Sequence, residues 1–193
     1  ARWMSPTTRD ITLELPECAT WEAGQYTLVR VAPFEWRPYS LASAPGRTIR
    51  LLVDVRTKGM GASWASTIAP GDDVELPYGH WLVTTDKDTT EAEAPDRRIF
   101  IATGTGIAPF LAAFELDGRD DDILIVGYSR TEDILTSRVD TPLPRLIRCV
   151  SREAAPGTFH GRITDYLNAE GIDPQATYYV CGSAHIVRDI SRI

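Results

Sequence analysis

The sequence predicts an antiparallel β-barrel domain followed by an α/β domain with a parallel sheet. In the first half, apolar and polar residues alternate with a period of two, as at Ile11, Leu13 and Leu15, which is typical of strands with one buried face. In the second half, continuous apolar runs such as 123–126 alternate with helical patterns, which indicates parallel strands covered on both faces. The change in the spacing of apolar residues therefore predicts that the two halves of the chain have different fold classes.

The first half contains the elements expected of a barrel. A second alternating segment covers 49–55, and Gly and Pro residues separate the strands at the spacing of a sandwich or barrel. Residues 74–76 (Val-Glu-Leu) predict a last short strand. The segment 85–96, rich in Thr, Asp, Glu and Ala, predicts a linker. We therefore place the barrel domain at 1–94 and the α/β domain at 95–193.

The second half alternates strands and helices. Apolar runs at 99–102, 123–126 and 178–181 predict parallel strands. Helical patterns cover 109–116, 163–170 and 185–193, and the second of these ends at Gly171. This alternation predicts an open α/β sheet, in which ligands bind at the carboxyl ends of the strands.

Composition excludes several classes of protein. The 193 residues carry 20 basic and 27 acidic groups, a net charge of −7, which argues against a nucleic-acid binder or a protein held on an anionic membrane. No apolar stretch approaches the ~20 residues that span a bilayer. Cys18, Cys149 and Cys181 show no CxxC spacing, so we expect no metal site and a reducing, cytoplasmic location. We also expect a monomer.

A glycine-rich motif directly follows the apolar run 99–102. It reads Thr103-Gly104-Thr105-Gly106, and Pro109 then opens a helical pattern. Glycines let the backbone approach a ligand, and free amides at a helix start favour a phosphate. A dinucleotide pyrophosphate would fit this motif, although an ordinary strand-to-helix turn has the same composition.

Three arginines follow at or just beyond the expected strand ends. Arg130 follows Ser129, Arg152 follows Ser151, and Arg162 lies ten residues further on. Guanidinium groups bind phosphate oxygens in pairs, and the two hydroxyls add donors. Each arginine alone would more often be a solvated surface group, but together they favour a terminal phosphate.

Two further motifs lie in the barrel half. The segment 37–40 (Arg-Pro-Tyr-Ser), expected between strands, offers a ring to stack and a cation for a phosphate. Gly61, Ala62 and Ser63 open a short helical segment that ends near Ile68, a second possible phosphate site. A plain surface turn and simple helix capping by Ser63 are the respective alternatives.

Taken in order, these motifs resemble the ferredoxin–NADP reductase family, most closely its bacterial ferredoxin/flavodoxin–NADP reductases. The matching segments appear in the family's order and span nearly the whole chain. They are 24–26 (Gly-Gln-Tyr), 37–40, 61–63, 103–109, 150–153 (Val-Ser-Arg-Glu) and 181–182 (Cys-Gly).

The resemblance implies FAD at the junction of the two domains and NADP on the second. It implies Ser40, near the flavin N5, and Cys181, beside the nicotinamide, as catalytic residues. Arg37 would contact the FAD pyrophosphate, Tyr39 would stack on the isoalloxazine, and the three arginines would bind the 2′-phosphate of NADP. The cofactor-binding candidates are Arg37, Pro38, Tyr39, Ser40, Val53, Val55, Gly61, Ala62, Ser63, Thr103, Gly104, Thr105, Gly106, Pro109, Ser129, Arg130, Ser151, Arg152, Arg162, Cys181 and Gly182.

The implied function is electron transfer between NADPH and a one-electron carrier such as ferredoxin or flavodoxin. Two alternatives stay open: the reductase component of an oxygenase system, and a flavin-binding electron-transfer subunit without turnover. Glu132 and Asp133 follow Arg130 closely and leave a preference for NADH possible, since an acidic residue commonly meets the ribose hydroxyl of NAD. For an acidic carrier we expect a basic patch formed by Arg47, Arg50 or Arg56.

The chain also departs from the family's pattern. Family members usually have a further strand before the region of Ile11 and a tail after the final helix, whereas this sequence stops at Ile193 inside that helix. The stretch between Arg130 and Arg152 is short for the helix expected there. These departures suggest a fragment or omitted segments.

Overall fold

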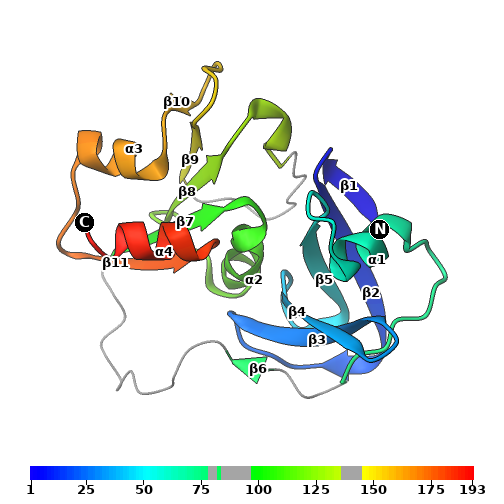
Figure 1. Ribbon diagram of the computed structural model, residues 1–193. Helices are drawn as coiled ribbons and strands as arrows, with labels where there is room; N and C mark the ends of the chain where they lie inside the picture. Colours follow the sequence, from blue (N-terminus) through cyan, green and yellow to red (C-terminus); the bar gives the residue numbers. More distant parts are fainter. Residues whose placement is uncertain (78–81, 84–96, 136–144) are drawn as a thin grey trace.

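A computed structural model describes residues 1–77, 82–83, 97–135 and 145–193. The first half, here called the barrel half, consists of two antiparallel three-stranded sheets, ordered β1-β2-β5 and β4-β3-β6 (Figure 1). Its elements are β1 (Arg2–Ser5), β2 (Thr8–Ala19), β3 (Gln25–Ala32), β4 (Glu35–Ser40), β5 (Gly46–Asp54), α1 (Met60–Thr67) and β6 (Leu82–Val83). The predicted barrel-like fold class is confirmed.

The alternating residues form the core of the barrel half. Ile11 lies opposite Leu51, and Leu13 lies opposite Ile49, in the antiparallel register of β2 and β5. These four side chains are buried together with Leu15 in one hydrophobic cluster. The period of two therefore identified the inner face of both strands correctly.

Two details of the expected barrel are wrong. Residues 37–40 do not lie between strands but inside β4, where they pair with β3. Residues 74–76 form no strand, although Arg30 N–H donates a hydrogen bond to the Glu75 carbonyl at 3.0 Å. A single hydrogen bond does not make a ladder, and the apolar Val74 and Leu76 instead pack against the barrel core.

The second half, here called the α/β half, contains a parallel sheet of order β10-β9-β8-β7-β11. This confirms the predicted α/β class, and helix α3 coincides with its predicted range. The elements are β7 (Arg97–Thr103), α2 (Ala108–Asp117), β8 (Ile123–Tyr128), β9 (Arg145–Val150), β10 (Phe159–His160), α3 (Ile163–Glu170), β11 (Ala176–Cys181) and α4 (Ala184–Ile190), with short 3-10 turns η1 (Gly104–Ile107) and η2 (Thr131–Asp133).

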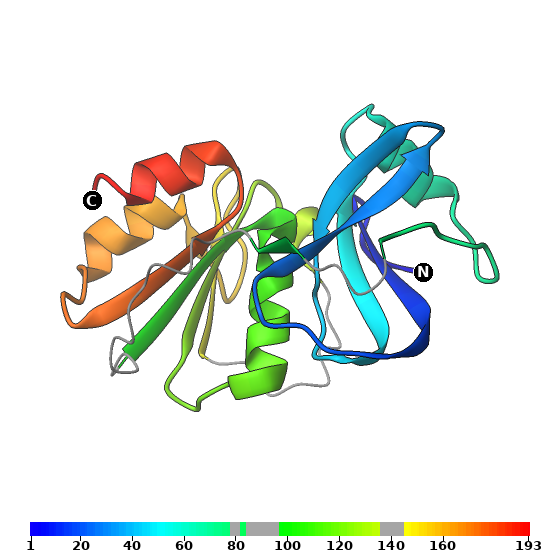
Figure 2. The same cartoon turned by 90° about the horizontal axis from the view of Figure 1, so that it is seen from below.

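The continuous apolar runs arise because helices cover both faces of this sheet. On β7, Ile99 and Ile101 face the cluster that contains residues of α3 and α4. The alternate residues Phe100 and Ala102 face α2. Figure 2 shows α2 in green on the side of the sheet next to the barrel half, and α3 and α4 in orange and red on the other.

Strand β11 is the exception, because it forms one edge of the sheet. Tyr179 is 38% exposed and stacks on Phe100, with ring centroids 4.9 Å apart. The apolar run 178–181 predicted a strand covered on both faces, and this part of the prediction is wrong. The ring of Tyr179 on β11 stacks on Phe100 of the neighbouring strand β7, which explains why this edge strand has an apolar sequence.

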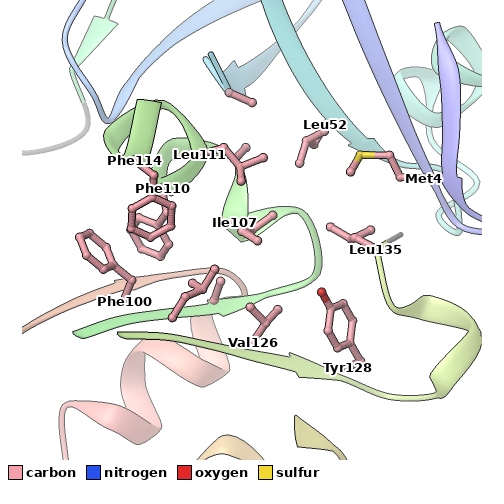
Figure 3. Packing of buried hydrophobic residues seen from close by; sticks show 14 of the residues in the cluster. Met4, Leu52, Phe100, Ile107, Phe110, Leu111, Phe114, Val126, Tyr128 and Leu135 are labelled. Carbon is pink, nitrogen blue, oxygen red and sulfur yellow. The ribbon is translucent and has the colours of Figure 1, made fainter. Parts of the chain in front are cut away.

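Helix α2 packs between the sheet and the barrel half. Its phenylalanines contact Phe100, while Met4 and Leu52 enter the same cluster from the barrel half (Figure 3). Leu135, beyond β8, lies beside them in Figure 3. One continuous core thus joins the two halves.

Parts of the sequence prediction lie outside the described residues. The expected linker 85–96 and the boundary between 94 and 95 lie entirely there, as do residues 136–144 of the short stretch that precedes β9. Strand β1 lies ahead of Ile11, where the family pattern places a strand. It pairs antiparallel with β2.

Candidate active site

A cavity of about 610 Å³ lies where the two halves meet. Its walls include 38–40 at the end of β4, residues 103–106 after β7, Ser129 after β8, and 181–183 after β11. The carboxyl ends of parallel strands thus face one side of the barrel half. This is where ligands bind in open α/β sheets, and the volume is in the range of small-molecule sites.

The two glycine motifs of the α/β half interlock at this edge. The backbone N–H of Ser183 donates to Thr103 Oγ1 at 3.3 Å. A Cβ at Gly106 would lie 2.5 Å from the Cys181 carbonyl oxygen, and a Cβ at Gly182, whose φ is +149°, would overlap Thr103 Oγ1. Only glycine allows this approach. Segments 103–106 and 181–183 therefore form a single wall.

The glycine-rich motif reaches α2 through an intermediate turn. The sequence predicted a helix directly after the strand, but η1 (Gly104–Ile107) comes first, and Gly104 adopts φ +52°. No side chain caps the start of this turn at Thr103. Since Gly104, Thr105 and Gly106 all line the cavity, this loop offers backbone amides to a ligand.

Tyr39 occupies the opposite wall, on β4. Its ring centroid lies 5.9 Å from that of Trp64 on α1, with the planes tilted by 32°. A Cβ at Gly61 would lie 2.5 Å from the Tyr39 hydroxyl, so α1 approaches β4 closely because position 61 is glycine. Burial raises the pKa of Tyr39, and Arg37 partly opposes this shift. The Tyr39 phenol is therefore neutral at physiological pH.

The other residues of segment 37–40 divide between the cavity and the outer surface. Pro38 and Ser40 line the cavity with Tyr39. Arg37 forms an ion pair with Glu35 at 2.8 Å and donates to the Trp36 carbonyl. It does not line the cavity as the structure has it.

Helix α1 begins without a side-chain cap. Its N-cap is Gly59, which has no side chain to offer. Ser63 lies inside the helix, and its N–H donates to the Gly59 carbonyl. Helix capping by Ser63, the alternative considered for this motif, is therefore wrong. Gly61 and Ala62 are buried and do not line the cavity.

The three arginines follow neighbouring strands, as predicted, but only one lines the cavity. Arg162 does so, together with Ser129 and Ser151. Arg130 and Arg152 are exposed and lie on adjoining loops, since the Arg152 N–H donates to the Ser129 carbonyl at 3.1 Å. The structure thus brings both serines and Arg162 to one end of the cavity, and it places Arg130 and Arg152 next to the two serines in sequence, on exposed loops.

The sequence analysis missed a polar cluster at the same cavity. Arg56 pairs with Asp54 through several hydrogen bonds and with Asp133 at 3.6 Å. Thr7 Oγ1 donates to Asp133 at 3.0 Å. Both carboxylates raise the pKa of Arg56. The sequence contained no signal for this cluster, because Thr7 and Asp133 lie 126 positions apart.

Three other predicted site residues lie elsewhere. Val53 is buried in the core of the barrel half, and Val55 packs against it. Pro109 is buried on α2. None of the three lines the cavity, so their predicted contact with a cofactor stays a prediction.

Two thiols line the cavity, and both are protonated at neutral pH. Burial raises the pKa of Cys149 to about 12 and also raises that of Cys181. Neither is therefore an activated nucleophile. Cys181 is suited to contact a ligand by packing.

Among the described residues, no group of three or more His, Cys, Asp or Glu side chains could hold a metal ion. No helix in the described part of the chain is long and apolar enough to cross a membrane.

Comparison with known proteins finds similar reductase components of dioxygenases. No family model matches the sequence. The reductase component 2 of a terephthalate 1,2-dioxygenase from Comamonas sp. is 31% identical over 201 residues, covering 93% of this chain and 57% of the relative. Component 1 from Comamonas sp. is 29% identical with the same coverage. The chain thus spans little more than half the length of these relatives.

Solved structures show the same fold. A ferredoxin NADP+ reductase from Neisseria gonorrhoeae with bound FAD and NADP superposes with a TM-score of 0.79 at 22% identity, covering 98% of this chain and 85% of that one. Phthalate dioxygenase reductase superposes with a TM-score of 0.76 at 18% identity, covering 98% and 60%. This chain therefore has the fold of these reductases, and its sequence is similar to that of dioxygenase reductase components. The resemblance inferred from the ordered motifs is confirmed.

Proposed function

We propose that this chain is a member of the ferredoxin–NADP reductase family and an FAD-dependent oxidoreductase unit that takes electrons from NADPH and passes them to a one-electron carrier. The observation that carries the proposal is one cavity with two unlike walls. Residues 38–40 of the barrel half face the interlocked segments 103–106 and 181–183. Such a site can hold two ring systems face to face.

The residues present fit FAD on the barrel side. The close approach of Gly61 to Tyr39 places the uncapped start of α1 beside a neutral aromatic ring. Tyr39 would stack on the isoalloxazine and Ser40 would hydrogen-bond near its N5. When bound, FAD supplies hydride acceptance and the release of electrons one at a time.

The α/β wall would bind the pyridine nucleotide. Amides of 104–106 would hold the pyrophosphate, and the backbone at Cys181 and Gly182 would place the nicotinamide against the flavin. The chain's contribution is alignment and exclusion of water, because the cofactors provide the hydride chemistry.

The arginine-rich end of the cavity favours NADPH over NADH. Arg162, Ser129 and Ser151 line it, and guanidinium groups bind a 2′-phosphate in pairs. Asp133, which could have met an NAD ribose, is instead bound to Thr7 and Arg56. The other acidic candidate, Glu132, is exposed and does not line the cavity.

The acceptor is proposed as ferredoxin or flavodoxin, with an oxygenase component as the second candidate. The names of the Comamonas relatives, both reductase components of a dioxygenase, favour the second. The basic patch expected for docking is largely absent at the predicted places. Arg50 pairs with Asp10 and Glu115, and Arg56 with Asp54 and Asp133. Neither is a free cation for an acidic carrier.

We further propose FAD binding by 1–94, nucleotide binding by 95–193, a monomer, and a cytoplasmic location. An anaerobic absorbance titration tests the central proposal. Protein loaded with FAD should lose its oxidised flavin band on addition of NADPH, at much lower concentration than with NADH. Bound flavin that neither nucleotide reduces would support the subunit without turnover, and failure to bind flavin would refute the proposal.

A matched pair of variants tests the nucleotide assignment. Arg162→Ala should raise the Kd for NADPH about tenfold, the loss of roughly one phosphate contact, with little change for NADH. Arg145→Ala is the control, because Arg145 is an exposed arginine at the opposite end of the sheet. Equal effects of the two variants, or equal effects on both nucleotides, would contradict the assignment.

A further inference from the structure

The loop that follows β8 is bound to the barrel half through one carboxylate. Asp133 ends turn η2 (Thr131–Asp133), and its side chain is 11% exposed. Thr7 Oγ1 donates to Asp133 Oδ1 at 3.0 Å, and Arg56 lies 3.6 Å from Oδ2. Both oxygens of a carboxylate in the α/β half are therefore used by residues of the barrel half.

The same loop is also held from two other sides. Glu153, after β9, accepts hydrogen bonds from the N–H and the hydroxyl of Thr131, both at 2.6 Å. Leu135 packs with Met4 and Leu52 in the core that joins the two halves (Figure 3). Of these three contacts, the one made by Asp133 is polar, joins the loop to the barrel half, and lies at the cavity.

This arrangement matters for hydride transfer if the proposed function is correct. The barrel half would hold the flavin, and the loop after β8 carries Ser129 and Arg130 toward the nucleotide. Transfer requires the reacting atoms to lie within ~3.5 Å, and a misplacement of about 1 Å can reduce the rate by as much as ~100-fold. A contact that fixes this loop to the barrel half would fix the nucleotide relative to the flavin.

We propose that Asp133 is a positioning residue that sets the register of the nucleotide-binding loop on the barrel half through Thr7 and Arg56. The proposal rests on the proposed function. It goes beyond that function because Asp133 is not itself a nucleotide ligand here: its oxygens are directed at protein donors.

Because Asp133 is charged, we expect its removal to affect the affinity for the nucleotide and the rate of hydride transfer differently. Arg56 is already paired with Asp54 at the end of β5, so Asp133 adds a second negative charge near the sites offered to phosphates. Removing it loosens the loop but also relieves repulsion of the nucleotide. Affinity should therefore change little while hydride transfer slows.

Single-turnover reduction of the FAD-loaded protein by NADPH tests this separation. Asp133→Ala removes both contacts and should lower the saturating rate about tenfold, with a Kd for NADPH within about threefold of wild type. Thr7→Val removes only the hydrogen bond and should have a smaller effect of the same kind. Glu132→Ala is the control for the loss of negative charge, since it deletes an exposed acid from the same loop, and it should leave the saturating rate unchanged.

Hydrogen exchange of the same proteins supplies a readout that needs no nucleotide. Amides of 130–135 should exchange faster in Asp133→Ala and Thr7→Val than in Glu132→Ala. Unchanged exchange, or faster exchange with an unchanged reduction rate, would overturn the positioning role, as would a parallel rise in Kd without loss of rate. If NADPH and NADH both fail to reduce the wild-type flavin, the proposed function fails first, and the positioning role with it.

Discussion

Two arginines, one on strand β5 and one just beyond it, form ion-pair clusters at the boundary between the halves. The two arginines differ in how deeply they are buried. Arg50, on the strand, is 16% exposed and pairs with Asp10 at 3.0 Å and Glu115 of α2 at 3.5 Å. Arg56, just beyond the strand, is 46% exposed and pairs with Asp54 and Asp133 at the cavity. Leu52 lies between the two clusters in the shared core.

This difference in burial indicates that the Arg50 cluster stabilises the fold, whereas the Arg56 cluster serves the cavity. Asp10 is only 1% exposed, so losing a partner leaves a charge buried without full compensation, which is costly. The cluster at Arg56 is open to solvent, where ion pairs contribute little to folding. We therefore expect the cluster at Arg56 to affect the position of the loop after β8 and to contribute little to the free energy of unfolding.

The largest effect is expected at the apolar centre of the boundary. Leu52→Ala should reduce the free energy of unfolding by about 3 kcal/mol, because it removes a buried side chain from a core made by both halves. Urea unfolding measures this, with Leu116→Ala as the control, since Leu116 is an exposed leucine on α2. Similar losses in the two variants would contradict a shared core.

A smaller loss is expected at the buried ion pair. Arg50→Met should cost about 2 kcal/mol, less than the usual cost of breaking a buried pair, because Arg2 also binds Asp10 at 2.9 Å. Arg47→Met, at an exposed position of the same strand, should cost little. If both variants unfold at the same urea concentration, the Asp10 cluster is not structural.

Local patterns predicted the elements of this fold well. The alternation at Ile11, Leu13 and Leu15 identified the inner face of β2, and the continuous run at 99–102 identified a sheet with two covered faces. Both signals arise from residues close in sequence. Even the glycine motifs, whose interlock could not be foreseen, were assigned to the correct strand ends.

The boundary between the halves could not be predicted in the same way. Leu52 broke the alternation of β5, and nothing local showed that it packs on another domain. Arg50 and Arg56 were expected to form a docking surface for an acidic carrier, and nothing local showed that Asp10 and Asp133, far away in sequence, pair with them. Contacts of this kind depend on the tertiary fold, which the sequence pattern does not encode locally.

At the cavity end, a substitution should barely change stability. Arg56→Met should lower the free energy of unfolding by less than about 1 kcal/mol, and this small loss should disappear in about 1 M salt, where exposed charges are screened. The loss in Arg50→Met should persist at the same salt concentration. Salt titration of both variants measures the contrast, and an equal salt response would remove the distinction between the two ends.

The smallest effect is expected from the pH-dependent contact between Glu153 and Thr131. Hydrogen bonds from Thr131 lower the pKa of Glu153 below its usual value, and Arg130 adds to this. In the unfolded chain a glutamate titrates near ~4.3, so the contact stabilises the folded state above that pH. The stabilisation is lost as the pH falls through the lower, native pKa. NMR of the Thr131 amide should show a titration at a pH below the usual glutamate pKa, and Glu153→Gln should abolish it. A Thr131 amide that titrates at the usual glutamate pKa would show that the loop after β8 is not held by an ionised Glu153, and would leave Asp133 as its main polar link at this end of the boundary.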